Sequence, residues 1–129
     1  MTSRWPDAEN LLALLAQATG PGSHVRDAGI LYAVAGRPHA ELFNQTVYPT
    51  VLEQAAALLH GIMVWRPLEL WNTGLAWAAA LGLLFRNGLD LAISAWEQMT
   101  LSDEISSGRL DDVAHIAMRL APFLQIRPA

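Results

Sequence analysis

Arg66 is the residue of this chain best placed to bind a charged ligand. It lies in the segment 65–71, where Pro67 disfavours helical geometry for the residue before it, and a long apolar helix is expected to follow directly. A guanidinium next to a helix N-terminus can bind a carboxylate or a phosphate. The alternative is a solvated surface arginine without a role, and the sequence leaves both interpretations open.

Tryptophans near Arg66 in the sequence suggest an apolar ligand pocket. These are Trp65, Trp71 and Trp77, joined by Leu68 and Leu70. Together with the arginine, such a pocket suits a flat or apolar ligand that carries a negative group. The alternative is that the tryptophans fill interior volume, which we favour for Trp77 because it lies well inside the expected helix.

The other titratable side chains do not form a metal-binding pattern. The chain has no cysteine, and His24, His39 and His115 lack metal-ligand spacing, so we expect no metal site and no cofactor. For His60 we favour a structural role, since a histidine on a helix face commonly finds a backbone partner. Solvated charges near helix ends are the simplest interpretation of four acidic residues, Asp103, Glu104, Asp111 and Asp112.

The hydrophobic pattern predicts an all-α protein in which five to six helices form a single compact domain over residues 1–129. No segment alternates convincingly as a strand, and residues 37–48 are expected to be irregular. Asp27, Thr50 with Glu53, and Asn72 or Thr73 are expected to cap helices. The expected helices span about residues 7–18, 27–36, 50–64, 72–86, 94–106 and 111–120.

The charge pattern argues against nucleic-acid binding. Twelve acidic residues stand against eight basic ones, all of the basic residues are arginine, and they form no cluster. The longest apolar run, residues 75–85, has 11 residues and is too short to span a bilayer, so no membrane contact is expected. Residues 1–10 carry two acidic side chains and no early apolar stretch, unlike a signal peptide. We therefore expect a cytoplasmic protein.

Blocks of the chain resemble the Doc (death-on-curing) branch of the Fic/Doc family, in the order in which that family has them. The blocks are residues 25–31, 48–60 and 76–88. Between the last two, residues 66–74 lie in register with the family motif His-x-Phe-x-Asp/Glu-Gly/Ala-Asn-Lys/Arg-Arg, whose Asn falls on Asn72. The resemblance implies a Doc-like helical domain of the Fic fold over the whole chain.

The other functional positions of the motif depart from the family pattern. Arg66 replaces the general-base His, Leu68 the Phe, Leu70 the acidic metal-binding residue, Trp71 the small residue, and Thr73 and Gly74 the two basic residues. In the family, the His accepts the proton of a hydroxyl that receives AMP or a phosphoryl group, and a guanidinium has no acceptor for a proton. Leucine offers a metal ion no oxygen, and glycine offers phosphoryl oxygens no charge. The sequence therefore predicts a pseudoenzyme whose candidate ligand-binding residues are Arg66, Leu68, Leu70, Trp71, Asn72, Thr73 and Gly74.

The expected function is the binding of a peptide or protein partner, toxin-antitoxin-like or regulatory. The resemblance implies a Phd-type antitoxin, whose C-terminal helix fills a groove between helices of Doc toxins. Two alternatives stay open: action on a small anionic or apolar molecule anchored by Arg66, and residual ATP-dependent phosphorylation or AMPylation of a protein. Residues 37–48 take the place of the family's flap, which pairs with target peptides along their backbone, and an ordinary connecting loop is the other interpretation.

Overall fold

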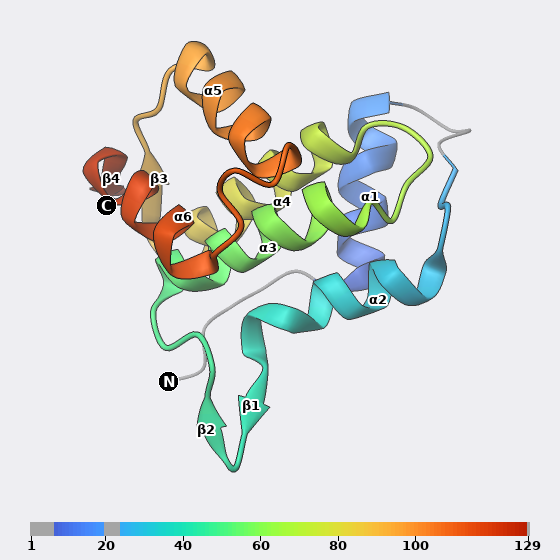
Figure 1. The fold of residues 1–129 in the computed structure, drawn as a ribbon, viewed down its shortest axis with the longest axis horizontal. Helices are drawn as coiled ribbons and strands as arrows, with labels where there is room; N and C mark the ends of the chain where they lie inside the picture. Colours follow the sequence, from blue (N-terminus) through green and yellow to red (C-terminus); the bar gives the residue numbers. More distant parts are fainter. Residues whose placement is uncertain (1–6, 20–23, 129) are drawn as a thin grey trace.

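The computed structural model describes residues 7–19 and 24–128 and folds them mainly into helices (Figure 1). Six α-helices occur in these ranges: α1 (Ala8–Thr19), α2 (Ala28–Gly36), α3 (Val51–Trp65), α4 (Asn72–Arg86), α5 (Ala95–Ser106) and α6 (Val113–Leu120). The predicted helical fold class is confirmed. The expectation that the N-terminal segment is not a signal peptide rests partly on residues 1–6. These residues lie outside the described ranges.

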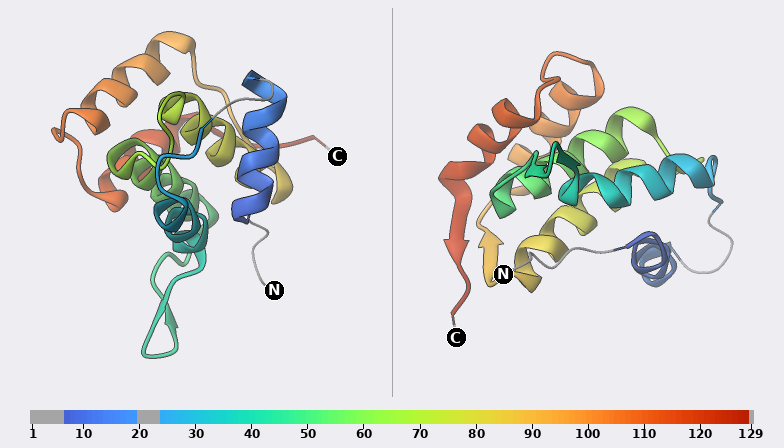
Figure 2. Two further views of the ribbon diagram at one scale, coloured as in Figure 1. Left: turned by 90° about the vertical axis from the view of Figure 1, so that its right-hand side faces the viewer. Right: turned by 90° about the horizontal axis from the view of Figure 1, so that it is seen from below.

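The central helix of the fold is α3, which is buried over the ten consecutive residues from Gln54 to Met63. A helix that is apolar on all sides must be covered on all sides, and α3 packs most extensively on α4 while also contacting α2, α5 and α6. Fully buried alanines at 55–57 of α3 and at 76, 79 and 80 of α4 let the helix backbones approach closely. Figures 1 and 2 show this central pair between α5 and α6 on one side and α1 and α2 on the other.

The sequence does not predict the four short strands of the structure. Strand β1 (Glu41–Leu42) pairs with β2 (Gln45–Thr46), and β3 (Leu89–Leu91) pairs with β4 (Leu124–Ile126), both antiparallel. Strands of two or three residues are too short for period-two alternation to be visible in a sequence.

Residues 37–48, expected to be irregular, form a 3₁₀ helix and a hairpin. The 3₁₀ helix η1 (Arg37–His39) continues from α2, and β1 and β2 follow it. Phe43 and Asn44 make the turn in left-handed conformations with φ of 51° and 63°. The hairpin projects away from the helices (Figures 1 and 2). A second 3₁₀ helix, η2 (Ala121–Phe123), leads from α6 into β4.

Two of the predicted helix caps are confirmed and one is wrong. The Asp27 carboxylate accepts a hydrogen bond from the Ile30 N–H over 3.1 Å, and the Thr50 hydroxyl accepts one from the Glu53 N–H over 3.1 Å. The expected cap of α4 at Asn72 or Thr73 is not formed, because α4 begins at Asn72 and the position before it, Trp71, makes no side-chain cap bond. The amide of Asn72 is instead engaged within the preceding loop, as described below.

Candidate functional site

The motif segment, residues 66–74, forms the connection between α3 and α4 and the first turn of α4. Its two loop ends are residues in left-handed conformation, Arg66 with φ of 50° and Trp71 with φ of 75°. Side chains with a Cβ pay roughly 1–2 kcal/mol for this conformation, so other contacts must hold the loop in place. Pro67 explains why α3 ends here, since it disfavours helical geometry at the residue before it.

The side chain of Asn72 fastens the loop from inside. Its Oδ1 accepts a hydrogen bond from the Leu68 N–H over 3.0 Å, and its Nδ2 donates to the Leu68 carbonyl oxygen over 2.9 Å. Asn72 and Leu68 are both buried. The structure therefore brings these two candidate residues together, in contact with each other and away from solvent.

Arg26 fastens the same loop from outside. Its Nε donates to the carbonyl oxygen of Arg66 and its Nη2 to that of Trp65, each over 2.6 Å. The backbone N–H groups of Arg26 and Asp27 both donate to the carbonyl oxygen of Pro67, over 2.7 and 3.1 Å. The sequence gives no local signal for these contacts, because the partners lie about forty residues apart in the chain.

The other five candidate residues lie on the surface. Arg66, Leu70, Trp71, Thr73 and Gly74 are all exposed, and the exposed fractions of Leu70 and Trp71 are 68% and 60%. Within the described ranges, the Arg66 guanidinium makes no hydrogen bond or ion pair that would neutralise it. A Cβ at Gly74 would meet nothing within 4 Å, so this glycine is not required by packing. The motif segment thus presents a cation and two large apolar side chains to solvent from a firmly held loop.

The two flanking tryptophans have different environments. Trp77 is buried in α4 and donates from its indole Nε1 to the Ser102 hydroxyl over 2.8 Å, which confirms the interior interpretation. Trp65, at the end of α3, is exposed on one part of its ring and contacts the guanidinium of Arg37 with another, 4.7 Å from the ring centre.

A second polar cluster lies along α3, at His60. The Arg37 Nη1 donates to Nδ1 of His60 over 2.9 Å, and Nε2 of His60 contacts Oδ1 of Asp111 over 2.7 Å. A guanidinium can only donate, so Nδ1 accepts and the ring proton sits on Nε2, which donates to the carboxylate. His60 therefore connects η1 to the segment between α5 and α6 through side chains. These contacts agree with the structural role expected for His60, but its partners are side chains and not backbone groups.

The sequence does not predict either partner of His60. Asp111 is exposed, as expected for a solvated charge, and it also accepts a hydrogen bond from His60. Arg37 has no distinguishing pattern around it in the sequence, and it also donates to the Ala57 carbonyl oxygen over 3.2 Å. A hollow of about 320 Å³ opens at this cluster, lined by Arg37, Val47, Tyr48, Glu53, His60, Asp111, Asp112, Val113 and Ala114.

Neither Arg66 nor His60 has a free proton acceptor. A guanidinium can only donate, and both ring nitrogens of His60 are already engaged. No three His, Asp or Glu side chains within residues 7–19 and 24–128 are grouped to hold a metal ion. None of the helices in these ranges is both long enough and apolar enough to cross a membrane.

Comparison with known proteins identifies the family. No protein-family profile matches the chain. It is 35% identical over 119 residues to a curated protein named Toxin Doc from Mycolicibacterium smegmatis, and the match covers 91% of each chain. With this identity over nearly the full length of both proteins, and with the helical fold expected from its sequence blocks, the chain belongs to the Doc family of toxin-antitoxin proteins.

Proposed function

We propose that this member of the Doc family acts by binding a peptide or protein partner through its motif segment, and not by transferring a nucleotidyl or phosphoryl group. The observation that carries the proposal is the exposure of Leu70 and Trp71 beside Arg66, which is also exposed and has no ion-pair partner among the described residues. Large apolar side chains gathered at the surface commonly mark a site of protein association. In the family motif the positions of Leu70 and Trp71 serve metal and phosphate binding, and the position of Arg66 holds the general base.

The residue types support the loss of family chemistry. A guanidinium at position 66 cannot accept the proton of an attacking hydroxyl, and an alkyl side chain at position 70 cannot coordinate a metal ion. Gly74 supplies no charge to developing phosphoryl oxygens. Removal of a single catalytic group commonly costs several orders of magnitude in rate, and here base, metal ligand and anion clamp all differ from the family pattern.

The fastening of the loop supports a preorganised binding surface. Asn72 holds Leu68 from inside, and Arg26 holds the carbonyl groups of Trp65 and Arg66 from outside. A surface that is already ordered loses little conformational entropy on binding, which favours affinity. The matching partner has apolar side chains next to a carboxylate, and we propose the C-terminal segment of a Phd-type antitoxin as this partner.

Isothermal titration calorimetry against candidate partner proteins encoded near this gene tests the proposal. We expect binding, with Trp71→Ala and Arg66→Ala each weakening it about tenfold or more, as for central anchors of an interface. Tyr32→Ala and Arg86→Ala are matched controls, because Tyr32 is exposed on α2 and Arg86 is exposed at the opposite end of α4 from the motif segment. Unchanged affinity in both test variants would refute a role for the motif segment.

The alternative function is binding of a small anionic molecule, favoured by the observation that Arg66 is exposed and forms no ion pair within the described ranges. Titration with a panel of aromatic carboxylates and phosphate esters separates this alternative from the proposal. Binding that Arg66→Ala abolishes, in the absence of any protein partner, would support the small-molecule function.

Residual transfer from ATP is tested with radiolabelled ATP and cell lysate. Under our proposal the purified protein labels nothing beyond the level of a heat-inactivated sample. Label above that level would show that family chemistry persists despite the altered motif.

A further inference from the structure

A groove between α5 and α6 lies apart from the motif segment. It has a volume of about 310 Å³ and is lined by Trp96, Glu97, Thr100, Leu101, Met118, Arg119, Pro122 and Phe123. In Figure 1 α6 lies on the left, while the loop between α3 and α4 lies on the right. The groove is therefore a surface separate from the motif segment.

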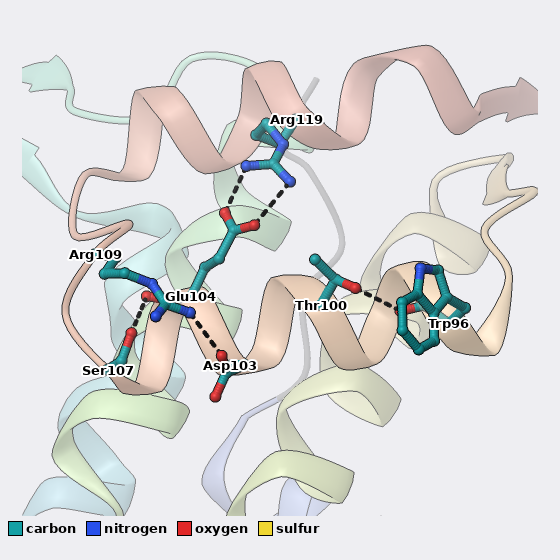
Figure 3. A network of polar contacts seen from close by, with 7 residues as sticks. All are labelled: Trp96, Thr100, Asp103, Glu104, Ser107, Arg109 and Arg119. Carbon is teal, nitrogen blue, oxygen red and sulfur yellow. Dashed lines mark hydrogen bonds and ion pairs between the residues drawn. The ribbon is translucent and has the colours of Figure 1, made fainter.

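Two charged side chains of α5 and α6 neutralise each other at this groove. Arg119 donates from Nη1 and Nη2 to the two carboxylate oxygens of Glu104, over 2.6 and 3.2 Å (Figure 3). The hydrogen bonds from Arg119 lower the pKa of Glu104 below its ordinary value, so the pair stays ionised. The reading of Glu104 as merely solvated is wrong, because this carboxylate joins the two helices.

Glu97 is left as the uncompensated charge of the groove. Its Oε1 accepts from the Ser94 hydroxyl over 3.0 Å, whereas its Oε2 is buried and meets no donor among the described residues. An acceptor enclosed without a donor destabilises the protein, and more so when it is charged. The final torsion of a glutamate side chain is soft, so this oxygen can turn toward a donor that enters the groove.

The rim of the groove suits an apolar segment with a cation. Trp96 and Met118 have exposed fractions of 74% and 69%, one on α5 and the other on α6. An indole face attracts ammonium and guanidinium groups, and methionine adapts its shape to varied apolar side chains. The groove therefore combines one unpaired negative charge with two exposed apolar side chains.

We propose that the groove between α5 and α6 docks a segment of a partner protein that presents a Lys or Arg side chain flanked by apolar side chains. The cation pairs with Glu97, and the apolar neighbours cover Trp96 and Met118. This requirement is opposite in charge to that of Arg66 in the motif segment. The groove thus gives the protein a second docking surface with a different specificity.

Three synthetic peptides of about twelve residues test the proposal. They share alternating Leu and Gln positions and differ only at the centre, which is Lys, norleucine or Glu. Binding is followed by the indole N–H signal of Trp96 in ¹H–¹⁵N spectra, assigned with Trp96→Phe. We expect the Lys peptide to bind about tenfold more tightly than the norleucine peptide, since a charge-assisted hydrogen bond is gained. The Glu peptide should bind most weakly.

Two variants separate the charge from the shape of the groove. Glu97→Gln keeps the size of the side chain and should bring the Lys and norleucine peptides to nearly equal affinity. Met118→Lys places an ammonium at the exposed rim and should weaken the Lys peptide most. Trp71→Ala, in the motif segment, should leave all three affinities unchanged, so this proposal can fail independently of the first.

Several outcomes would overturn the proposal. Equal affinity of the Lys and norleucine peptides for the wild-type protein would remove the role of Glu97. Shifts of the Trp71 signal in place of Trp96 would assign the peptide to the motif segment. A Trp96 signal that moves with protein concentration alone, together with dimers in sedimentation velocity, would show that a second copy covers the groove. Absence of binding by all three peptides would also contradict it.

Discussion

Arg37 donates to Nδ1 of His60 over 2.9 Å, and this single contact fixes which nitrogen of the ring carries the proton. The guanidinium can only donate, so Nδ1 is the acceptor and Nε2 donates to Asp111 over 2.7 Å. The three residues come from η1, from α3 and from the segment before α6. A neutral imidazole thus joins a cation to an anion across the side of the central helix.

Replacement of His60 by alanine is expected to destabilise the fold. The change removes the acceptor of a half-buried guanidinium and the packing of a buried ring, at a cost of about 2–4 kcal/mol. Urea unfolding measures the change in the free energy of unfolding. Asp111→Asn is the milder comparison, because its side chain is exposed and an amide oxygen still accepts from Nε2.

The tautomer itself can be observed independently of stability. Long-range ¹H–¹⁵N spectra of the wild-type protein distinguish a protonated from an unprotonated ring nitrogen. For His60 we expect the proton on Nε2, and a proton on Nδ1 would be incompatible with the Arg37 contact.

Replacement of Asn72 by alanine is expected to loosen the motif segment. The change leaves the buried N–H and carbonyl oxygen of Leu68 without partners, and each unsatisfied group costs about 1–3 kcal/mol. Hydrogen exchange at the Leu68 amide, together with urea unfolding, measures the effect. Thr73→Ala, at the exposed neighbour, should change the free energy of unfolding by no more than about 0.5 kcal/mol. Equal losses of unfolding free energy in the two variants would argue against a role of the Asn72 side chain in holding the loop.

The helices could be predicted from the sequence because caps and apolar stretches within each helix specify them. Asp27 and Thr50 cap α2 and α3 through side-chain bonds that span only three residues, so a sequence reader can see them. The apolar stretch of α4 likewise predicts that this helix is buried, and Trp77 lies inside as expected.

The site could be predicted only in part, because the hydrogen bonds that hold it join residues far apart in the sequence. Arg26 reaches the carbonyl groups of Trp65 and Arg66, and His60 reaches Asp111, across roughly forty to fifty residues of chain. No pattern of spacing encodes such contacts. The motif position of Asn72 was visible in the sequence, but its bonds to Leu68 compete with capping of α4, and this competition decided its role.

The link between α5 and α6 is expected to weaken in acid. The pKa of Glu104 is lowered below its ordinary value, mainly by the hydrogen bonds from Arg119. A carboxyl group with a lower pKa in the folded state stabilises the fold above its unfolded pKa, and this contribution is lost as the pH falls through the folded pKa. The melting temperature of Glu104→Gln should therefore lie below that of the wild type at pH 7. The two should converge as the pH falls below the ordinary range of a glutamate.

The control for this pH profile is Glu69→Gln, which removes one exposed negative charge from the motif segment. The melting temperature of Glu69→Gln should not begin below that of the wild type at pH 7 and then approach it as the pH falls. A Glu104→Gln deficit that is the same at pH 7 and in acid would show that packing, and not the ion pair, accounts for the effect.

Two glycines at α4 and its end are expected to respond to alanine in opposite directions. Gly82 lies inside α4, and a Cβ there would meet nothing within 4 Å, so Gly82→Ala should stabilise the protein by about 0.5–1 kcal/mol through higher helix propensity. Gly88 follows α4 with φ of 78°, a left-handed conformation in which alanine pays roughly 1–2 kcal/mol although space is free. Urea unfolding of both variants checks the pair. Stabilisation by Gly88→Ala would mean that the turn after α4 does not need the left-handed conformation, and destabilisation by Gly82→Ala would mean that α4 is more closely covered at that position than the structure has it.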